Sequence, residues 1–335
     1  MKKLIYLGSL VLLGSVLVPE VHAASSPFIG QWAINPAGGG AGWLEVKQDA
    51  GSLVGTLLWM GGSPEPQSRV WVDGEKLFAL RLENEDVRDA DGKVIRKLVR
   101  PVMLTATLDG AELRGQLSRP ARDGMSAGHE NFGGVRIPPP PPAPDMSKIH
   151  FGEPIQLFNG KNLDGWKLTD AGAANGWSVQ DGLLVNNPVQ TPGQHKSYGN
   201  LRTVREFEDF QLTVEVNVGK GGNSGVYLRG IYEVQVQDSF GHPVDCHNLG
   251  AIYGRITPSV AAEKPPGEWQ TLDITLVQRH ATVKLNGKLI IDNAPLGGCT
   301  GGALWSDQSR PGPIYLQGDH TGIKYRSVVL RPVGK

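Results

Sequence analysis

A run of five consecutive prolines, Pro138 to Pro142, divides this chain of 335 residues. Proline has no backbone N–H and a fixed φ, so such a run is excluded from sheet interiors and forms a stiff polyproline II segment. The chain is also longer than one small hydrophobic core usually requires. We therefore expect an N-terminal β domain over 24–136, a Pro-rich linker over 137–152 and a second domain over 153–335.

The first 23 residues have the features of a secretory signal peptide. Lys2 and Lys3 precede an uncharged apolar stretch over 4–18, and Val-His-Ala at 21–23 is a small-residue cleavage site. The stretch is short for an ordinary membrane span, although an uncleaved anchor is the alternative. We expect a periplasmic or secreted protein that has no membrane contact after cleavage.

Composition favours an all-β fold and argues against a nucleic-acid partner. Lysine plus arginine and aspartate plus glutamate both number 33, so the chain lacks the basic excess of nucleic-acid-binding proteins. Glycine (45) and proline (24) are abundant, which indicates many turns. No segment of the mature chain sustains a helical period of 3.6 residues.

The N-terminal domain has the pattern of short antiparallel strands. Residues 103–108 and 112–117 alternate around Asp109-Gly110, which predicts a hairpin. We expect a small up-and-down β-barrel or β-sandwich. Its tryptophans either form a sugar-stacking platform or plug the barrel interior, and the second role is the commoner one. They are Trp32, Trp43, Trp59 and Trp71.

The C-terminal domain has the stronger strand signals. Residues 210–218 alternate strictly between apolar and polar side chains. Residues 282–291 form a hairpin around Asn286-Gly287, a pair that suits a type I′ turn. Further strands are expected over 269–277 and 324–331. Many antiparallel strands in about 180 residues indicate two stacked sheets, as in a sandwich or jelly roll.

Polar side chains share one face of two neighbouring predicted strands. Alternation places Tyr227 and Arg229 together on the first strand, and Glu233 with Gln235 on the second. So many polar groups are costly in a dry core. A wet cleft that binds sugar hydroxyls satisfies them, and an ordinary solvent-exposed face is the alternative.

Two further groups of residues could carry chemistry. Gln317 lies on a predicted strand, and the adjacent residues Asp319 and His320 follow this strand. A carboxylate beside a histidine can tune the histidine as a general base or a metal ligand. His242, Asp245 and His247 lie within six residues, but their spacing is not that of a zinc site.

The two cysteines, Cys246 and Cys299, either form a disulfide or remain as free thiols.

The chain resembles the 3-keto-disaccharide hydrolase domain family over about residues 153–333. The motifs that carry this resemblance are Leu-Phe-Asn-Gly-Lys-Asn-Leu-Asp-Gly-Trp at 157–166, Asn-Ser-Gly-Val-Tyr-Leu-Arg at 223–229, Tyr-Glu-Val-Gln-Val-Gln-Asp at 232–238, Gly-Ala-Ile-Tyr-Gly at 250–254, Leu-Gln-Gly-Asp-His at 316–320 and Lys-Tyr-Arg at 324–326. The resemblance implies a concanavalin A-like jelly roll that acts on glycosides oxidised at C3 of the sugar. It also implies a sugar 3-oxidase that acts upstream in the same pathway.

A ketone at C3 acidifies the proton at C2, so a base can remove it and the C1 substituent can leave by elimination. We expect His320 or Glu233 to act as the base, with Asp238 or Asp319 orienting its neighbours. Arg229 is the expected enolate stabiliser. A divalent metal ion would also stabilise an enolate, but the sequence identifies no ligands for it. The residues expected to bind the sugar are Asn223, Tyr227, Arg229, Gln235, Tyr253, Gln317, Asp319 and Arg326.

Three other functions compete with this hypothesis. An ordinary glycoside hydrolase would use a carboxylate pair such as Glu233 and Asp238, although five residues along a strand place these side chains on opposite faces. A non-catalytic carbohydrate-binding module is also compatible with a jelly roll, since a fold does not determine a function. A surface scaffold that uses the proline run as a spacer is the third.

Overall fold

The computed structural model describes residues 26–191 and 196–334, so the predicted signal segment over 1–23 lies outside the described residues. Regular structure in the described part is almost entirely β-strand, and its one helical element is the 3-10 turn η1 (Met146–Lys148). The all-β prediction is confirmed. Within the described residues, no helix has the length and apolar character needed to cross a membrane.

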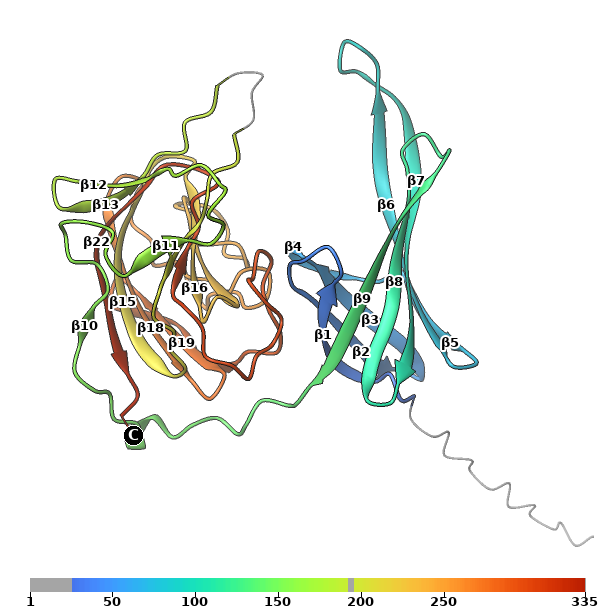
Figure 1. Ribbon diagram of the computed structural model, residues 1–335, viewed down its shortest axis with the longest axis horizontal. Helices are drawn as coiled ribbons and strands as arrows, with labels where there is room; N and C mark the ends of the chain where they lie inside the picture. The colour runs from blue at the N-terminus through green and yellow to red at the C-terminus, as the bar shows by residue number, and fades with distance from the viewer. Residues whose placement is uncertain (1–25, 192–195, 335) are drawn as a thin grey trace, which may run out of the picture.

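The N-terminal part is one antiparallel sheet of nine strands, in the order β4-β3-β2-β1-β9-β8-β7-β6-β5 (Figure 1). Its strands are β1 (Gly30–Pro36), β2 (Gly42–Asp49), β3 (Ser52–Trp59), β4 (Gly61–Pro66), β5 (Arg69–Asp73), β6 (Lys76–Arg88), β7 (Val94–Asp109), β8 (Glu112–Pro120) and β9 (Ala127–Ile137). The Gln67 N–H donates to the Gly55 carbonyl (2.8 Å), and β5 lies against β3. The sheet therefore curls round a core that includes Trp32, Ile34 and Leu44.

The four tryptophans of this sheet do not form one platform. Trp32 is buried inside the curled sheet, whereas Trp43 is buried in the core shared with the C-terminal part. Trp59 meets Phe132 edge-on, and Trp71 stacks on Phe78. The pleat sends neighbouring side chains to opposite faces, which separates these rings. Trp32 has the predicted role of a barrel plug, and Trp59 packs against the same core.

The C-terminal part is a sandwich of two antiparallel sheets. The larger sheet has the order β12-β13-β22-β15-β18-β19-β20, with β10 also paired to β22, and the smaller has the order β11-β14-β21-β16-β17. The strands are β10 (Ile155–Gln156), β11 (Trp166–Leu168), β12 (Trp177–Gln180), β13 (Leu183–Asn186), β14 (Leu201–Thr203), β15 (Phe210–Val218), β16 (Asn223–Leu228), β17 (Tyr232–Gln237), β18 (Trp269–Val277), β19 (His280–Leu285), β20 (Lys288–Pro295), β21 (Tyr315–Leu316) and β22 (Ile323–Pro332).

Apolar side chains of both sheets fill the space between them. Leu212, Val214 and Val216 of β15 are fully buried, as the strict alternation of this strand predicts. Val226 and Val234 enter the same core from the smaller sheet. The opposite face of the smaller sheet is therefore free to carry polar groups.

The two parts of the chain are joined by more than the linker. The proline segment runs along the sandwich, where Arg279 donates to the Pro138 carbonyl (2.9 Å). Ala33, Trp43 and Leu58 of the N-terminal sheet belong to the same hydrophobic core as the sandwich. Figure 1 shows β4 beside the loops of the C-terminal part. This contact brings the turn between β3 and β4 to the polar face of the smaller sheet.

Candidate functional site

The β16–β17 hairpin places the candidate catalytic carboxyl. Tyr227 lies opposite Glu233 in the register, and Gly225 lies opposite Gln235. Because Val226 and Val234 face the core, the pleat turns Tyr227 and Glu233 to the other face of the sheet. A Cβ on Gly225 would lie 2.9 Å from Glu233 Cδ, so only glycine leaves room there for the carboxyl.

This polar face is buried although it is the outer face of a sheet. Glu233 is 3% exposed and Gln235 is 1% exposed, which excludes the ordinary solvent-exposed face. Loops and a turn of the N-terminal sheet cover it and leave a cavity of about 260 Å³. The residues lining this cavity are Gly61, Gly62, Asn200, Asn223, Tyr227, Glu233, Gln235, Tyr253, Gly301, Gly302, Tyr315, Gln317, Asp319 and His320.

The surroundings of Glu233 favour its protonated form. Burial raises the pKa of Glu233 to about 8, and the charge of His320 opposes this rise with a smaller effect. The hydrogen-bond geometry agrees, because Tyr227 Oη lies 2.9 Å from Glu233 Oε2 and 2.6 Å from the carbonyl oxygen of Gly301. A tyrosine hydroxyl has one proton and a carbonyl can only accept. Both contacts are satisfied when Tyr227 donates to Gly301 and a protonated Glu233 donates to Tyr227.

A stacked pair of tyrosines forms the floor beside this carboxyl. The rings of Tyr227 and Tyr315 are 4.0 Å apart and nearly parallel. Asn200 donates to Tyr315 Oη (2.9 Å) and accepts from the Gly318 N–H (2.7 Å). Burial raises the pKa of both tyrosines, so both hydroxyls remain protonated at neutral pH.

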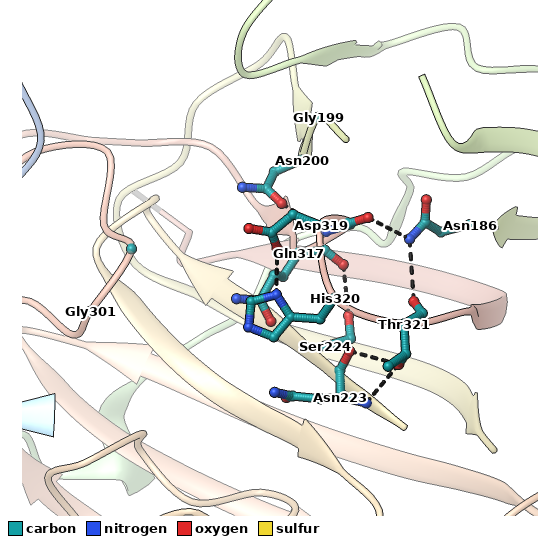
Figure 2. A network of polar contacts seen from close by, with 12 residues as sticks. Asn186, Gly199, Asn200, Asn223, Ser224, Gly301, Gln317, Asp319, His320 and Thr321 are labelled. Carbon is teal, nitrogen blue, oxygen red and sulfur yellow. Dashed lines mark hydrogen bonds and ion pairs between the residues drawn. The ribbon is translucent and has the colours of Figure 1, made fainter. Parts of the chain in front are cut away.

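The second chemical group is the pair His320 and Asp319, on the loop after β21 (Figure 2). His320 Nδ1 lies 2.9 Å from Asp319 Oδ1. The hydrogen bond that His320 donates to Asp319 raises the pKa of His320, even though desolvation opposes this. Burial alone would raise the pKa of Asp319, but the hydrogen bond and charge of His320 lower it. When His320 is neutral, Nδ1–H donates to Asp319 and Nε2 is left as the basic nitrogen.

Buried hydrogen bonds hold this loop in place, as Figure 2 shows. Asn186 Nδ2 donates to the Gly318 carbonyl (2.8 Å), and Ser224 Oγ donates to the Gln317 carbonyl (2.8 Å). Thr321 Oγ1 donates to the Asn223 carbonyl (3.0 Å). The loop is therefore fixed to both β13 and β16, and His320 is presented from a rigid support.

Two amide side chains offer free acceptors at the cavity. Asn223 Oδ1 and Gln317 Oε1 are buried and have no hydrogen-bond partner within 26–191 and 196–334. A buried acceptor without a partner costs free energy. Hydroxyl groups of a bound sugar would supply these missing donors.

The cavity unites eight of the eleven predicted site residues. These are Asn223, Tyr227, Glu233, Gln235, Tyr253, Gln317, Asp319 and His320. They come from two strands and two loops, and the fold brings these residues together on one cavity.

The structure places Arg229, Asp238 and Arg326 outside this cavity. Arg229 follows the end of β16 with a positive φ of 56°, and its guanidinium donates to the Gln308 carbonyl (2.7 Å). Asp238 lies beyond β17 and accepts from the Gly221 N–H (2.9 Å). Arg326 belongs to the larger sheet, where it pairs with Glu215 (2.6 Å). These residues stabilise loops and the outer sheet face, and none of the three lies on the cavity, where the sequence had placed them as catalytic or sugar-binding residues.

Sequence reasoning missed part of the lining. Gly61 and Gly62 come from the N-terminal sheet, and Gly301 and Gly302 from a loop without a local pattern. Asn200 also lacked any periodic signal. Only Tyr315 had a usable signal, because it shares a strand face with Gln317.

The other sequence candidates have structural roles. Ser63 Oγ lies 2.8 Å from His247 Nε2, so this histidine joins the two parts of the chain. In the part of the chain that the structure describes, no group of three or more His, Cys, Asp or Glu side chains is arranged to hold a metal ion. Cys246 and Cys299 are both free thiols.

An antiparallel β-sandwich whose smaller sheet carries, on its outer face, a covered polar cavity with a carboxyl, an imidazole and several amides is a fold and site suited to a saccharide. Residues 153–331, more than half of the chain, match the family model described as the 3-keto-alpha-glucoside-1,2-lyase-like domain. The protein belongs to this family, and the resemblance found in the sequence is confirmed.

One curated relative and two solved structures illustrate the likeness. The chain is 29% identical to a 3-keto-disaccharide hydrolase of Bacteroides thetaiotaomicron, over 36% of this chain and 51% of the relative, so it matches about half of that protein. A candidate glycosyl hydrolase from Parabacteroides distasonis is 27% identical, with 63% and 96% of the two chains covered and a TM-score of 0.44. The beta-glucanase of Bacillus licheniformis is 12% identical, with 56% and 98% covered and a TM-score of 0.32.

Proposed function

We propose that this protein cleaves the glycosidic bond of 3-keto glycosides, including 3-keto disaccharides, by proton abstraction at C2 and elimination at C1. Family membership supports the substrate class. The observation that carries the proposal is the pairing of two groups on one small cavity. One is a protonated carboxyl, Glu233, and the other is an imidazole oriented by a carboxylate, His320 with Asp319.

The chemistry needs one base and one acid. The base takes the proton from C2, which the neighbouring ketone has acidified, and the electron pair forms the C1–C2 double bond. The C1–O bond breaks, and the departing oxygen takes a proton from the acid. Water then adds across the double bond, with hydroxyl at C1 and a proton at C2, which gives the free 3-keto sugar and completes a net hydrolysis.

The two groups are suited to different roles. His320 acts as the base through Nε2, since Nδ1 is engaged with Asp319 (2.9 Å). Glu233 acts as the acid, because its raised pKa of about 8 keeps its proton at neutral pH. Each group regains its starting protonation state when water adds in the second half of the reaction.

The amides at the cavity position the sugar. The free acceptors of Asn223 and Gln317 take hydrogen bonds from its hydroxyls, and Tyr253 lies on the same lining. The stacked rings of Tyr227 and Tyr315 line the same cavity, on the face of the smaller sheet that points away from the sandwich core. With Arg229 outside the cavity, the amide N–H groups of its lining are the donors for a developing enolate oxygen.

The proposal also defines the setting of the reaction. A substrate with a ketone at C3 must be supplied by an oxidation, so an upstream sugar 3-oxidase is the reaction that provides it. The signal-like segment at 1–23 supports action in the periplasm or outside the cell.

Isotope incorporation tests the mechanism. A 3-keto α-glucoside cleaved in D₂O should give 3-keto-glucose with deuterium at C2, since the C2 proton is lost and replaced from solvent. The remaining substrate and an enzyme-free sample correct for spontaneous exchange. A product without deuterium at C2 beyond these controls would show direct hydrolysis and refute the elimination.

A further inference from the structure

The tip of the β3–β4 hairpin, here called the turn and formed by Met60 and the first three residues of β4 (61–63), lies against the candidate site. We propose that this turn is a wall of the active site and restricts it to a short saccharide. The inference rests on the proposed function for its substrate class. It assigns a role to the N-terminal domain, which lies outside the region that the family model matches.

The turn is fixed to the loop that covers the cavity. The Gly302 N–H donates to the Met60 carbonyl (2.8 Å), and Ser63 Oγ lies 2.8 Å from His247 Nε2. A Cβ on Gly301 would lie 2.7 Å from the Gly62 nitrogen and closer still to its carbonyl oxygen. The two backbones therefore meet with no space between them.

The same loop holds the candidate acid. Tyr227 Oη lies 2.6 Å from the Gly301 carbonyl and 2.9 Å from Glu233 Oε2. Because these contacts are continuous, a displacement of the turn would shift Gly301, and with it Tyr227 and Glu233. The N-terminal domain acts here as a positioning element for a group in the sandwich domain.

The contact between the two domains includes buried apolar side chains of the N-terminal sheet. Trp43 and Leu58 are buried in the same hydrophobic core as the sandwich residues. The guanidinium carbon of Arg255 lies 4.3 Å from the centre of the Trp43 ring. Cys299 Sγ donates to the Gly42 carbonyl (3.5 Å). Burial of two large apolar side chains stabilises a contact by several kcal/mol, about 1.5–3 for each. This burial stabilises the position of the wall against the site.

The volume of the cavity and the absence of a side chain at Gly61 determine the size of the substrate that can bind. The cavity of about 260 Å³ is below the range of roughly 300–1,000 Å³ for drug-sized ligands, which suits one sugar ring with a small leaving group. Gly62 needs glycine because its φ is 74°. Gly61 has no such φ, and no atom lies within 4 Å of the place that a Cβ would take, so a side chain there would extend into open space at the lining.

A filling variant tests the wall. Gly61→Phe in the full chain should weaken binding of a 3-keto disaccharide, measured by calorimetry, by about tenfold or more. Gly133→Phe is the matched control, since Gly133 is also in the N-terminal sheet, has an ordinary φ and has no atom within 4 Å of its Cβ position. Unchanged affinity of Gly61→Phe would overturn the proposal. So would a wild-type protein that binds a 3-keto trisaccharide more tightly than the disaccharide.

A wedge variant tests the connection to Glu233 without any ligand. In Gly301→Ala the turn must move by roughly 1 Å to restore ordinary contact. Hydrogen exchange in the 227–237 segment should rise relative to Gly219→Ala, a control in the sandwich with free space at its Cβ position. Equal exchange in the two variants would contradict the positioning role. If the wild-type protein cleaves no 3-keto glycoside, the proposed function fails, while the exchange comparison still decides this inference.

Discussion

Replacing Glu233 by glutamine removes an ionisable group and keeps the shape of a protonated carboxyl. The glutamine amide can donate to Tyr227 Oη as the protonated acid does, so the hydrogen bond at 2.9 Å has a substitute donor. The variant should lose activity, because an amide cannot act as the acid. It should also be more stable than the wild-type protein at neutral pH.

The expected gain follows from the shift in pKa. Glu233 has a pKa of about 8 when folded and a reference value of 4.5. Between these values the folded protein binds more protons than the unfolded chain, so its stability falls as the pH rises. Each unit of pH in this window costs about 1.4 kcal/mol, and the cost at pH 7 is about 3 kcal/mol. Glu233→Gln should therefore match the wild type near pH 4.5 and exceed it by about 3 kcal/mol at pH 7.

Urea unfolding of both proteins from pH 4.5 to 8 measures this difference, and other titrating groups cancel in the comparison. Glu215→Gln is the control of opposite sign. The hydrogen bond from Arg326 lowers the pKa of Glu215, so its contribution is present above pH 4.5 and is lost as the pH falls. That variant should be less stable than the wild type at pH 7. A stability difference for Glu233→Gln that is independent of pH would refute a buried, protonated Glu233.

Three more predictions address the site and the interface. His320→Ala should lower kcat/KM by about 10²–10⁴. It should change the free energy of unfolding by less than about 1 kcal/mol, because this side chain is 43% exposed. A large loss of stability would instead indicate a structural role. The pH profile of kcat/KM should be bell-shaped, with an acidic limb above 6.5 from His320 and an alkaline limb near 8 from Glu233; activity that keeps rising above pH 9 would exclude Glu233 as the acid. Trp43→Ala should cost about 3–5 kcal/mol in calorimetric stability, and a near-neutral effect would mean that the two domains are not firmly docked.

Much of the fold could be predicted because period-two alternation is a local property. The predicted strands over 210–218 and 269–277 coincide with β15 and β18. Asn286 and Gly287 both have positive φ, as the predicted type I′ turn requires. Strands of two or three residues such as β10 and β11 were not predictable, since they are too short to show a period.

The site was predictable where one strand carries it and unpredictable where the chain bends. Alternation correctly grouped Tyr227 and Glu233. It failed at Arg229 because β16 ends one residue earlier and the backbone turns left-handed there. The sequence correctly places Arg326 on a strand. No local signal shows that this strand, β22, belongs to the other sheet. The contribution of Gly61 depends on domain docking, which no pattern within one domain encodes.

The most direct test of the proposed activity compares two chromogenic substrates, a 3-keto α-glucoside and its unoxidised parent. The account predicts release of the chromophore from the keto compound only, with strong loss in both Glu233→Gln and His320→Ala. Release from the parent at a similar rate, or undiminished turnover of the keto compound by a Glu233→Gln, His320→Ala double variant, would contradict it.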